Sequence, residues 1–212
     1  YPRWRRKRLD ASPFPAPWLS ILRRNLPVYR AMWPDQQKQL RQLIVRFLDS
    51  KTFIGCAGQQ ITDEVRVTIA AHACLLLLSR PTNEYQELRS VLVYPSGFVV
   101  DRDEVDEAGV VSEDEHFLIG ESWENGKVIL AWDRTEYAGY VDGSNLVIHE
   151  FAHKLDMQNG VANGFPPMHP NMDRAAWTRA FSTGFDDFQR RCTRGEDVGI
   201  DHYAASSPAE FF

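Results

Sequence analysis

One short pattern in the sequence is specific for metal chemistry: His149-Glu150-Phe151-Ala152-His153, which matches H-E-x-x-H. Residues four apart on a helix lie one above the other, so both imidazoles can point at a single Zn²⁺. Glu150 lies about 100° round the helix from His149, where a general base for a metal-activated water belongs. The pattern therefore predicts one zinc ion per chain, with His149 and His153 as ligands and Glu150 as the catalytic base.

The surrounding stretch has the features of a buried helix. Ser144 is a suitable N-cap and Asn159-Gly160 a suitable stop, and no proline or glycine lies between them. The broad apolar face consists of Leu146, Val147, Ile148, Phe151, Ala152 and Leu155. Histidines and a carboxylate on such a helix need partners, and a metal supplies one. The alternative, a chance match on a core helix, is disfavoured by the caps and the helical context.

A third ligand must come from elsewhere, because a catalytic zinc keeps three protein ligands and one open position. The metzincin continuation H-x-x-G-x-x-H is excluded, since its glycine position is Asp156 and its last histidine position is Asn159. A carboxylate on a later helix is the remaining common solution. The candidates are Asp156, Asp173, Asp186, Asp187, Glu196, Asp197, Asp201 and Glu210, with His169 and His202 as imidazole alternatives.

Two of these carboxylates have a second interpretation. Asp156 is too near His153 along the helix to complete a tetrahedron, and it suits acceptance of a hydrogen bond from a ligand imidazole. It could instead be a surface carboxylate near Lys154. Glu210 begins a predicted helix, which would fix its direction, but Ser207-Pro208-Ala209-Glu210 also matches a capping box. The residue pattern alone leaves both roles open for Glu210.

Composition limits the other functions of the chain. Its 212 residues, 43% of them hydrophobic, are enough for one globular domain. The balance of 24 Lys+Arg against 29 Asp+Glu gives a net charge of −5, which argues against direct nucleic-acid binding. The sequence contains no apolar run of about 18 residues, so no membrane span is predicted. Three cysteines, Cys56, Cys74 and Cys192, lack metal-type spacing and fit a reducing, cytoplasmic location.

The chain is predicted to consist of a short N-terminal segment and one domain. Residues 1–20 are rich in proline and carry the run Arg5-Arg6-Lys7-Arg8, which we expect to be a solvated arm rather than a nucleic-acid or membrane-surface patch. Residues 21–212 are expected to form one domain, truncated at the C-terminus because the chain ends as a helix begins. Helical periodicity is found in residues 34–50, in residues 63–79 after the N-cap Thr62, and in residues 173–193. His72 is expected to be structural, since no partner histidine lies four residues away.

Strand patterns fill the middle of the chain and indicate the α+β class, with a small mixed or antiparallel sheet packed on helices. The strands expected are Val91–Tyr94, Phe98–Val100, Phe117–Ile119 and Val128–Trp132, the last two joined by the hairpin signal Glu124-Asn125-Gly126. Val128–Trp132 is a candidate edge strand for pairing with a peptide substrate, or else an ordinary core strand. Residues 101–116 form an acidic segment without EF-hand spacing, which we interpret as solvated surface or a partner contact.

Two blocks of residues resemble one known family. They are His149–Asp156 with Asn159-Gly160, and Tyr203-Ala204-Ala205 with Pro208-Ala209-Glu210-Phe211, and the similarity extends back through Val93-Tyr94-Pro95 and Phe98–Val100. They look like the Mlc titration factor A family of zinc metallopeptidases, also called DgsA anti-repressors. This family is a gluzincin family similar to the catalytic domain of anthrax lethal factor. The resemblance implies a zincin-like catalytic domain over residues 21–212.

The resemblance also implies roles for individual residues. It makes Glu210 the third zinc ligand and Tyr203 an active-site residue, which we expect to stabilise an oxyanion; the alternative is a packing tyrosine. It implies aminopeptidase-like hydrolysis of short peptides, linked to glucose uptake through the transcriptional repressor Mlc. The alternative function is a non-catalytic anti-repressor that binds and sequesters this repressor.

Overall fold

The computed structural model describes residues 3–78, 80, 85–96, 98–100, 104–105, 111–112, 116–118, 120–123, 126–136, 145–169 and 171–212. The α-helices are α1 Arg3–Ala11, α2 Ala16–Asn25, α3 Pro34–Ser50, α4 Asp63–Leu75, α5 Trp132–Glu136, α6 Leu146–Asp156, α7 Arg174–Thr193 and α8 Pro208–Phe211. The 3-10 helices are η1 Pro27–Ala31, η2 Met157–Asn159 and η3 His202–Ala205. The strands are β1 Thr52–Gly55, β2 Ser90–Tyr94, β3 Phe98–Val100, β4 Glu104–Val105, β5 Val111–Ser112, β6 His116–Leu118, β7 Gly120–Trp123 and β8 Lys127–Ala131.

The long helices predicted from periodicity are present. α3 begins at Pro34, which suits the first helical position because its backbone has no N–H to leave unpaired. α4 starts after Thr62 and α7 after Asp173, and in both cases the side-chain oxygen of the capping residue accepts a backbone N–H of the first turn. α4 ends at Leu75, earlier than expected. Within the described ranges, no helix is long and apolar enough to cross a membrane.

The main sheet has the strand order β1-β2-β8-β7 and is mixed. β1, β2 and β8 run parallel, and β7 is antiparallel to β8. The prediction of a mixed sheet is confirmed, and its antiparallel alternative is wrong. Parallel neighbours require long crossover connections, and here α4 lies between β1 and β2. Such distant pairing leaves no local signal in the sequence.

The predicted hairpin is present, but its first strand is displaced. β7 pairs with β8, whereas Phe117 and Leu118 belong to β6, which pairs with β3. Because β8 lies between β2 and β7, the prediction that Val128–Trp132 is an edge strand is wrong. Residues 128–131 are buried core positions, and Trp132 already begins α5. In the predicted turn, Glu124 and Asn125 lie outside the described residues.

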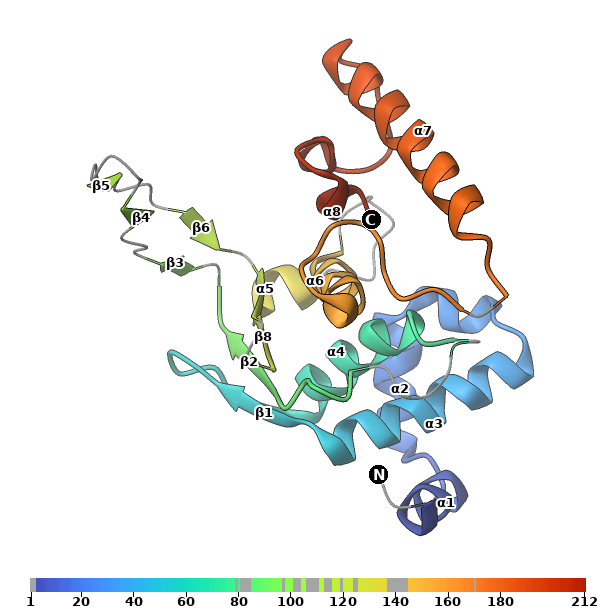
Figure 1. Cartoon of the computed structure of the whole chain (residues 1–212). Helices are drawn as coiled ribbons and strands as arrows, with labels where there is room; N and C mark the ends of the chain where they lie inside the picture. Colours follow the sequence, from blue (N-terminus) through green and yellow to red (C-terminus); the bar gives the residue numbers. More distant parts are fainter. Residues whose placement is uncertain are drawn as a thin grey trace.

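A narrow extension leaves the main sheet. The pairs β3·β6 and β4·β5 are both antiparallel, and in Figure 1 they project away from the helices. Most of the predicted acidic segment 101–116 lies outside the described residues. Its described parts, Glu104–Val105 and Val111–Ser112, pair with each other as β4 and β5.

The N-terminal segment, expected to be a solvated arm, forms a helix attached to α3. Arg46 of α3 donates two hydrogen bonds to the Asp10 carboxylate at 2.7 and 2.6 Å, and Arg5 of α1 lies 3.0 Å from Asp49. These ion pairs join side chains 36 and 44 residues apart. Residues 3–11 have no buried side chain, in keeping with a solvated segment, but they form a helix joined to α3. A run of like charges in the sequence does not reveal such distant partners.

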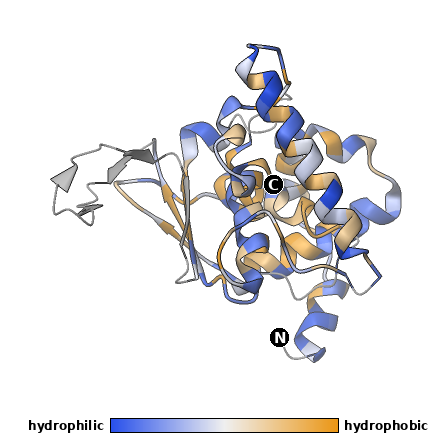
Figure 2. Cartoon of the chain, turned by 45° about the horizontal axis from the view of Figure 1, so that its top comes forward, coloured by the Kyte–Doolittle hydropathy of each residue, from blue (hydrophilic) through white to orange (hydrophobic). Residues whose placement is uncertain are grey.

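α6 crosses the middle of the molecule, with α4 and the sheet on one side and α8 on another (Figure 1). Val147, Phe151 and Leu155 recur every four residues along it and are at most 2% exposed. Figure 2 shows hydrophobic residues concentrated toward this centre and hydrophilic residues on the outward sides of the helices. The buried stripe therefore fixes α6 in the core and leaves another face of the same helix for chemistry.

Phe151→Ala is expected to lower the free energy of unfolding by about 3 to 5 kcal/mol, because it removes a fully buried ring. The ring packs against Tyr85, with centroids 5.0 Å apart, and against Phe47, at 5.7 Å. Chemical denaturation measures the effect. Val161→Ala, at an exposed position, is the control and should change stability by less than about 0.5 kcal/mol. Similar losses in both variants would contradict this assignment of the core.

Candidate metal centre

The H-E-x-x-H segment lies on α6, as the sequence predicts. The side-chain oxygen of Asn145 accepts the N–H of Ile148 at 2.9 Å, so Asn145 is the N-cap of α6, and the predicted cap Ser144 lies outside the described residues. At the other end, α6 continues into η2, which stops at Gly160 with φ 136°. A glycine tolerates this positive φ without strain. The helix is thus delimited by local side-chain and backbone chemistry.

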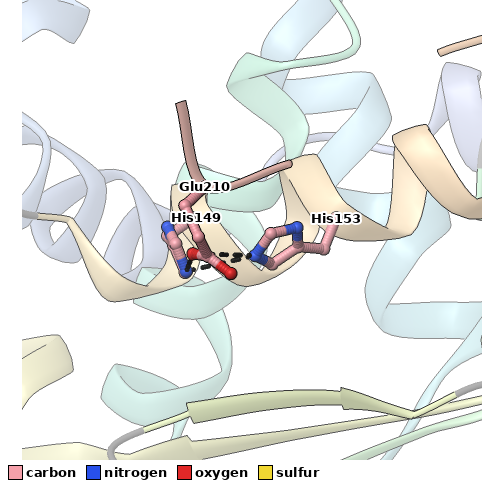
Figure 3. A group of neighbouring side chains, drawn as sticks. All are labelled: His149, His153 and Glu210. Carbon is pink, nitrogen blue, oxygen red and sulfur yellow. Dashed lines mark hydrogen bonds and ion pairs between the residues drawn. The ribbon is translucent and has the colours of Figure 1, made fainter. Parts of the chain in front are cut away.

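Three atoms converge beside α6 (Figure 3). His149 Nε2 lies 3.2 Å from His153 Nε2, and Glu210 Oε2 of α8 lies 3.2 Å from the first nitrogen and 3.5 Å from the second. In a tetrahedral zinc site with bonds of about 2.0 to 2.1 Å, ligand atoms are separated by about 3.3 Å. Among the described residues, these three side chains form the group that could hold a metal ion.

Burial and hydrogen bonding at this cluster also fit a cation. Exposed side-chain fractions are 37% for His149, 13% for His153 and 18% for Glu210. In the described part of the chain, Glu210 Oε2 is buried and no donor meets it in hydrogen-bond geometry. A cation placed among the three atoms would supply the partner that this buried carboxylate oxygen lacks. The residues present therefore fit a divalent metal, and two nitrogens with one oxygen are a common zinc ligand set.

The two interpretations of Glu210 are separated by the structure. The Ser207 side-chain oxygen accepts the backbone N–H of Glu210 at 3.3 Å, so Ser207 caps α8. The Glu210 carboxylate points to His149 and His153 instead of back to the cap (Figure 3). The helix start therefore uses the backbone of Glu210, and its side chain remains able to contribute to a metal site.

The His149 imidazole, followed by that of His153, lowers the pKa of the Glu210 carboxyl from 4.5 to about 2. Partial burial acts in the opposite direction but is the weaker influence. A hydrogen-bonding or positively charged imidazole favours the ionised carboxylate. Glu210 is therefore in the charged form that binds a metal at any physiological pH.

This pKa gives a pH dependence for the metal-free protein. A carboxyl with a lowered pKa stabilises the fold above its unfolded value of 4.5, and this stabilisation is lost as the pH falls toward about 2. Urea unfolding of the wild type and of Glu210→Gln between pH 6 and pH 2 measures it. The stability difference between the two proteins should shrink as the pH falls through this window. A difference that stays constant would contradict the assignment.

The other carboxylates that were considered as ligands are occupied elsewhere. Asp173 caps α7, Asp201 caps η3 by accepting the N–H of Tyr203, and Asp197 accepts the N–H of Gly199. Asp187 pairs with Arg190, and Glu196 pairs with Arg191. His169 and His202 are outside the described metal-binding group, as is Asp186. His72 is a core residue, 1% exposed, with Nδ1 2.9 Å from the Thr68 carbonyl oxygen.

Asp156 has neither of the two roles that the sequence suggested. It is fully buried, which excludes the surface interpretation, and its Oδ2 accepts the backbone N–H groups of Asn163 and Gly164, both at 2.6 Å. The expected bond from a ligand imidazole is not found in the described residues, where His153 Nδ1 and Asp156 Oδ1 have no partner. The loop after α6 takes Oδ2 of this carboxylate, and a loop after Gly160 was expected from the sequence but its bonds to Asp156 were not.

Glu150 and Tyr203, the predicted catalytic pair, differ in exposure. Glu150 is 4% exposed on α6, whereas Tyr203 on η3 is 62% exposed. Burial raises the pKa of the Tyr203 hydroxyl, and the negative charges of Glu210 and Glu150 raise it further. Tyr203 thus lies within electrostatic range of both carboxylates and stays protonated at neutral pH. A protonated phenol can donate a hydrogen bond.

An α-helix with two histidines one turn apart, met by a carboxylate from a separate helix, has the ligand arrangement of a zinc site built on the H-E-x-x-H motif. The family model described as glucose-regulated metallo-peptidase M90 matches residues 1–212, and the chain belongs to this family.

Three related proteins match this chain over similar lengths. The uncharacterized protein slr2042 of Synechocystis sp. (strain ATCC 27184 / PCC 6803 / Kazusa) is 39% identical over 212 residues, which cover 99% of this chain and 77% of that protein. Mlc titration factor A of Klebsiella pneumoniae (strain 342) is 34% identical over 198 residues, or 92% of this chain and 74% of that protein. Mlc titration factor A of Escherichia fergusonii is 35% identical with the same coverage. The matches therefore span nearly the whole chain.

Proposed function

We propose that the chain is a zinc-dependent peptidase in which His149, His153 and Glu210 hold one Zn²⁺. The observation that carries the proposal is the mutual separation of the three ligand atoms, 3.2, 3.2 and 3.5 Å. These lengths match the edges of a zinc tetrahedron with one corner left open. Membership of a family described as metallo-peptidases supports the same conclusion.

Glu150 is the general base of the proposed reaction. When bound, zinc lowers the pKa of a water molecule toward about 7 and polarises the carbonyl of the bond to be cleaved. The Glu150 carboxylate accepts the proton of the attacking water and returns it to the leaving amine. Its burial on α6, at 4% exposure, keeps its position defined beside the ligand His149.

Tyr203 is proposed to donate a hydrogen bond to the oxyanion that develops on the substrate. Its pKa is raised, first by burial and then by the neighbouring carboxylates, so the hydroxyl keeps the proton that such a bond requires. The side chain is largely exposed, which leaves it accessible to a substrate. This role follows the resemblance of Tyr203-Ala204-Ala205 to the titration factor family.

β7 replaces β8 as the strand proposed to take the peptide backbone. β7 is an edge strand of the main sheet: β8 pairs with one side of it, and among the described strands none follows on its other side. β7 also contacts α6. A peptide in extended conformation can pair with such an edge through main-chain hydrogen bonds. The aminopeptidase-like preference for short peptides is proposed from the resemblance alone.

Metal analysis combined with a cleavage assay tests the proposed function. Purified protein loaded with Zn²⁺ and then desalted should retain about one zinc per chain and release the N-terminal residue from short chromogenic peptides. A chelator should abolish cleavage, and added zinc should restore it. Protein that retains no zinc, or that cleaves peptides equally with and without chelator, would overturn the proposal.

A second function is favoured by the name of the relatives, Mlc titration factor A. We propose that this chain also binds a repressor of the Mlc type and thereby connects to glucose regulation, which the description of the matched family also mentions. Binding does not require hydrolysis. A Glu150→Gln variant that still binds purified repressor would show that this function is independent of hydrolysis. No measurable binding by either the wild type or the variant would rule the second function out.

A further inference from the structure

The loop that follows α6 and η2 lies between α6 and α8, the two helices that supply the proposed metal ligands. α6 is called the metal helix below. We infer that Asp156 is a positioning residue for Glu210, acting through this loop; the inference rests on the proposed metal centre. Asp156 is the last residue of α6, three positions after His153. Its distance from the metal ligands along the helix is therefore fixed by the helix itself.

The first step is the bond between Asp156 and the loop. Asp156 Oδ2 accepts two backbone N–H groups, of Asn163 and Gly164, each at 2.6 Å, and the side chain is fully buried. Charge-assisted hydrogen bonds of this kind are short and strong. Asn159 of η2 adds a bond from its side-chain amide to the Phe165 carbonyl oxygen at 2.6 Å. The loop is thus attached to the C-terminal end of the metal helix.

The second step is the contact between the loop and α8. Gly164 has φ +76°, a conformation that favours glycine, and a Cβ placed there would lie 2.6 Å from the Pro208 carbonyl oxygen. The same Cβ would lie 2.9 Å from the Phe181 ring of α7. The loop backbone therefore lies directly against the first residue of α8 and against α7, with no space for a side chain.

The third step places Glu210 within α8. This helix has four residues and begins at Pro208, two positions before Glu210. Its Phe211 ring is enclosed by aromatic side chains of α7, with centroids 5.3 Å from Phe181, 5.4 Å from Phe185 and 5.3 Å from Phe188. α8 thus packs on α7 through Phe211 and on the loop through the contact of Pro208 with Gly164. Removing the Asp156 carboxylate loosens the loop that makes the second contact.

Asp156→Ala is expected to weaken zinc binding about 10-fold to 100-fold, the range found when groups that orient metal ligands are removed. Competition with a chromophoric chelator measures the dissociation constant without relying on activity. Asp156→Asn keeps the shape and one neutral acceptor, so it should recover part of the loss. The matched control is Asp197→Ala, which removes an exposed aspartate that also accepts a glycine N–H, and it should leave zinc affinity unchanged.

A double-mutant cycle separates positioning from general destabilisation. In a Glu210→Ala background, the Asp156→Ala change should alter metal affinity less than about twofold, because the group that Asp156 positions is gone. Cu²⁺ is the probe for this cycle, since it binds two imidazoles more tightly than zinc does. Equal losses in both backgrounds would overturn the inference. So would unchanged zinc affinity in Asp156→Asn, the variant to use where Asp156→Ala does not fold.

The result also distinguishes this inference from the proposed function. Wild-type protein that retains no zinc contradicts the metal centre itself. Wild-type protein with about one zinc, together with an Asp156→Ala variant of the same affinity, contradicts only the role of Asp156. Loss of affinity that depends on Glu210 supports both.

Discussion

Glu150→Gln is expected to reduce peptide hydrolysis by about 100-fold to 10,000-fold and to leave zinc stoichiometry unchanged. Glutamine has the same shape as glutamate, but it cannot accept the proton of the attacking water. The large loss of hydrolysis is expected because Glu150 is assigned to proton transfer. Zinc stoichiometry should not change, because Glu150 is not among the three residues whose ligand atoms converge. Initial rates on a short chromogenic peptide, measured with matched zinc loading, give the comparison.

The control for this experiment is Glu196→Gln. Glu196 is a partly exposed carboxylate that pairs with Arg191, outside the described metal-binding group, so this variant should keep wild-type rates. Zinc content and circular dichroism should be equal in all three proteins. A Glu150→Gln variant that keeps more than about a tenth of wild-type activity would remove Glu150 from its assigned role, because a general base contributes at least about 100-fold.

Glu210→Ala should weaken zinc binding by more than about 100-fold, the second large effect that we expect. It deletes one of three ligands, whereas changes in groups that only orient ligands cost about 10-fold to 100-fold. The Ser207 cap uses the Glu210 backbone N–H, which alanine retains, so α8 should still form. Zinc dissociation constants from chelator competition measure the loss.

Glu210→Gln provides a second variant, since its amide oxygen is a weaker ligand than a carboxylate. It should fall between the wild type and Glu210→Ala in zinc affinity. Ser207→Ala, which removes the cap and keeps the carboxylate, should have a smaller effect than Glu210→Ala. A larger effect of Ser207→Ala would return Glu210 to the role of a helix-start residue.

The metal helix could be predicted from the sequence because its signals are local. The spacing of His149 and His153, the apolar stripe with Phe151, and the stop at Gly160 all depend on residues within two or three turns. The helices that begin at Pro34 and after Asp173 were predicted for the same reason. Local chemistry decides where these helices begin.

Glu210 shows where local reasoning stops. Ser207-Pro208-Ala209-Glu210 predicts a helix start correctly, but a capping pattern cannot show what lies opposite the carboxylate. That information is in the packing of Phe211 on α7 and of Gly164 on Pro208. Gly164 follows Asn163, a pair typical of turns with positive φ, so the turn itself could have been found from the sequence.

The position of β8 within the sheet was mispredicted for a related reason. The continuous apolar run Val128–Trp132 indicates a strand but does not give its neighbours, and β8 pairs with β2, which lies more than 30 residues earlier in the chain. The attachment of the N-terminal charge run to α3 was missed likewise, because the ion pair of Arg5 with Asp49 joins residues distant in sequence. Both outcomes depend on tertiary contacts that override local patterns.

Anomalous diffraction at the zinc edge, from crystals of the zinc-loaded protein, tests the metal centre most directly. We predict a single anomalous peak, bonded to His149 Nε2, His153 Nε2 and a carboxylate oxygen of Glu210 at about 2.0 to 2.2 Å, with a fourth position open to water. The three atoms are already within 3.5 Å of one another, so only small adjustments are needed. A zinc ion bound elsewhere, or bound to the two histidines with Glu210 turned away, would contradict the account.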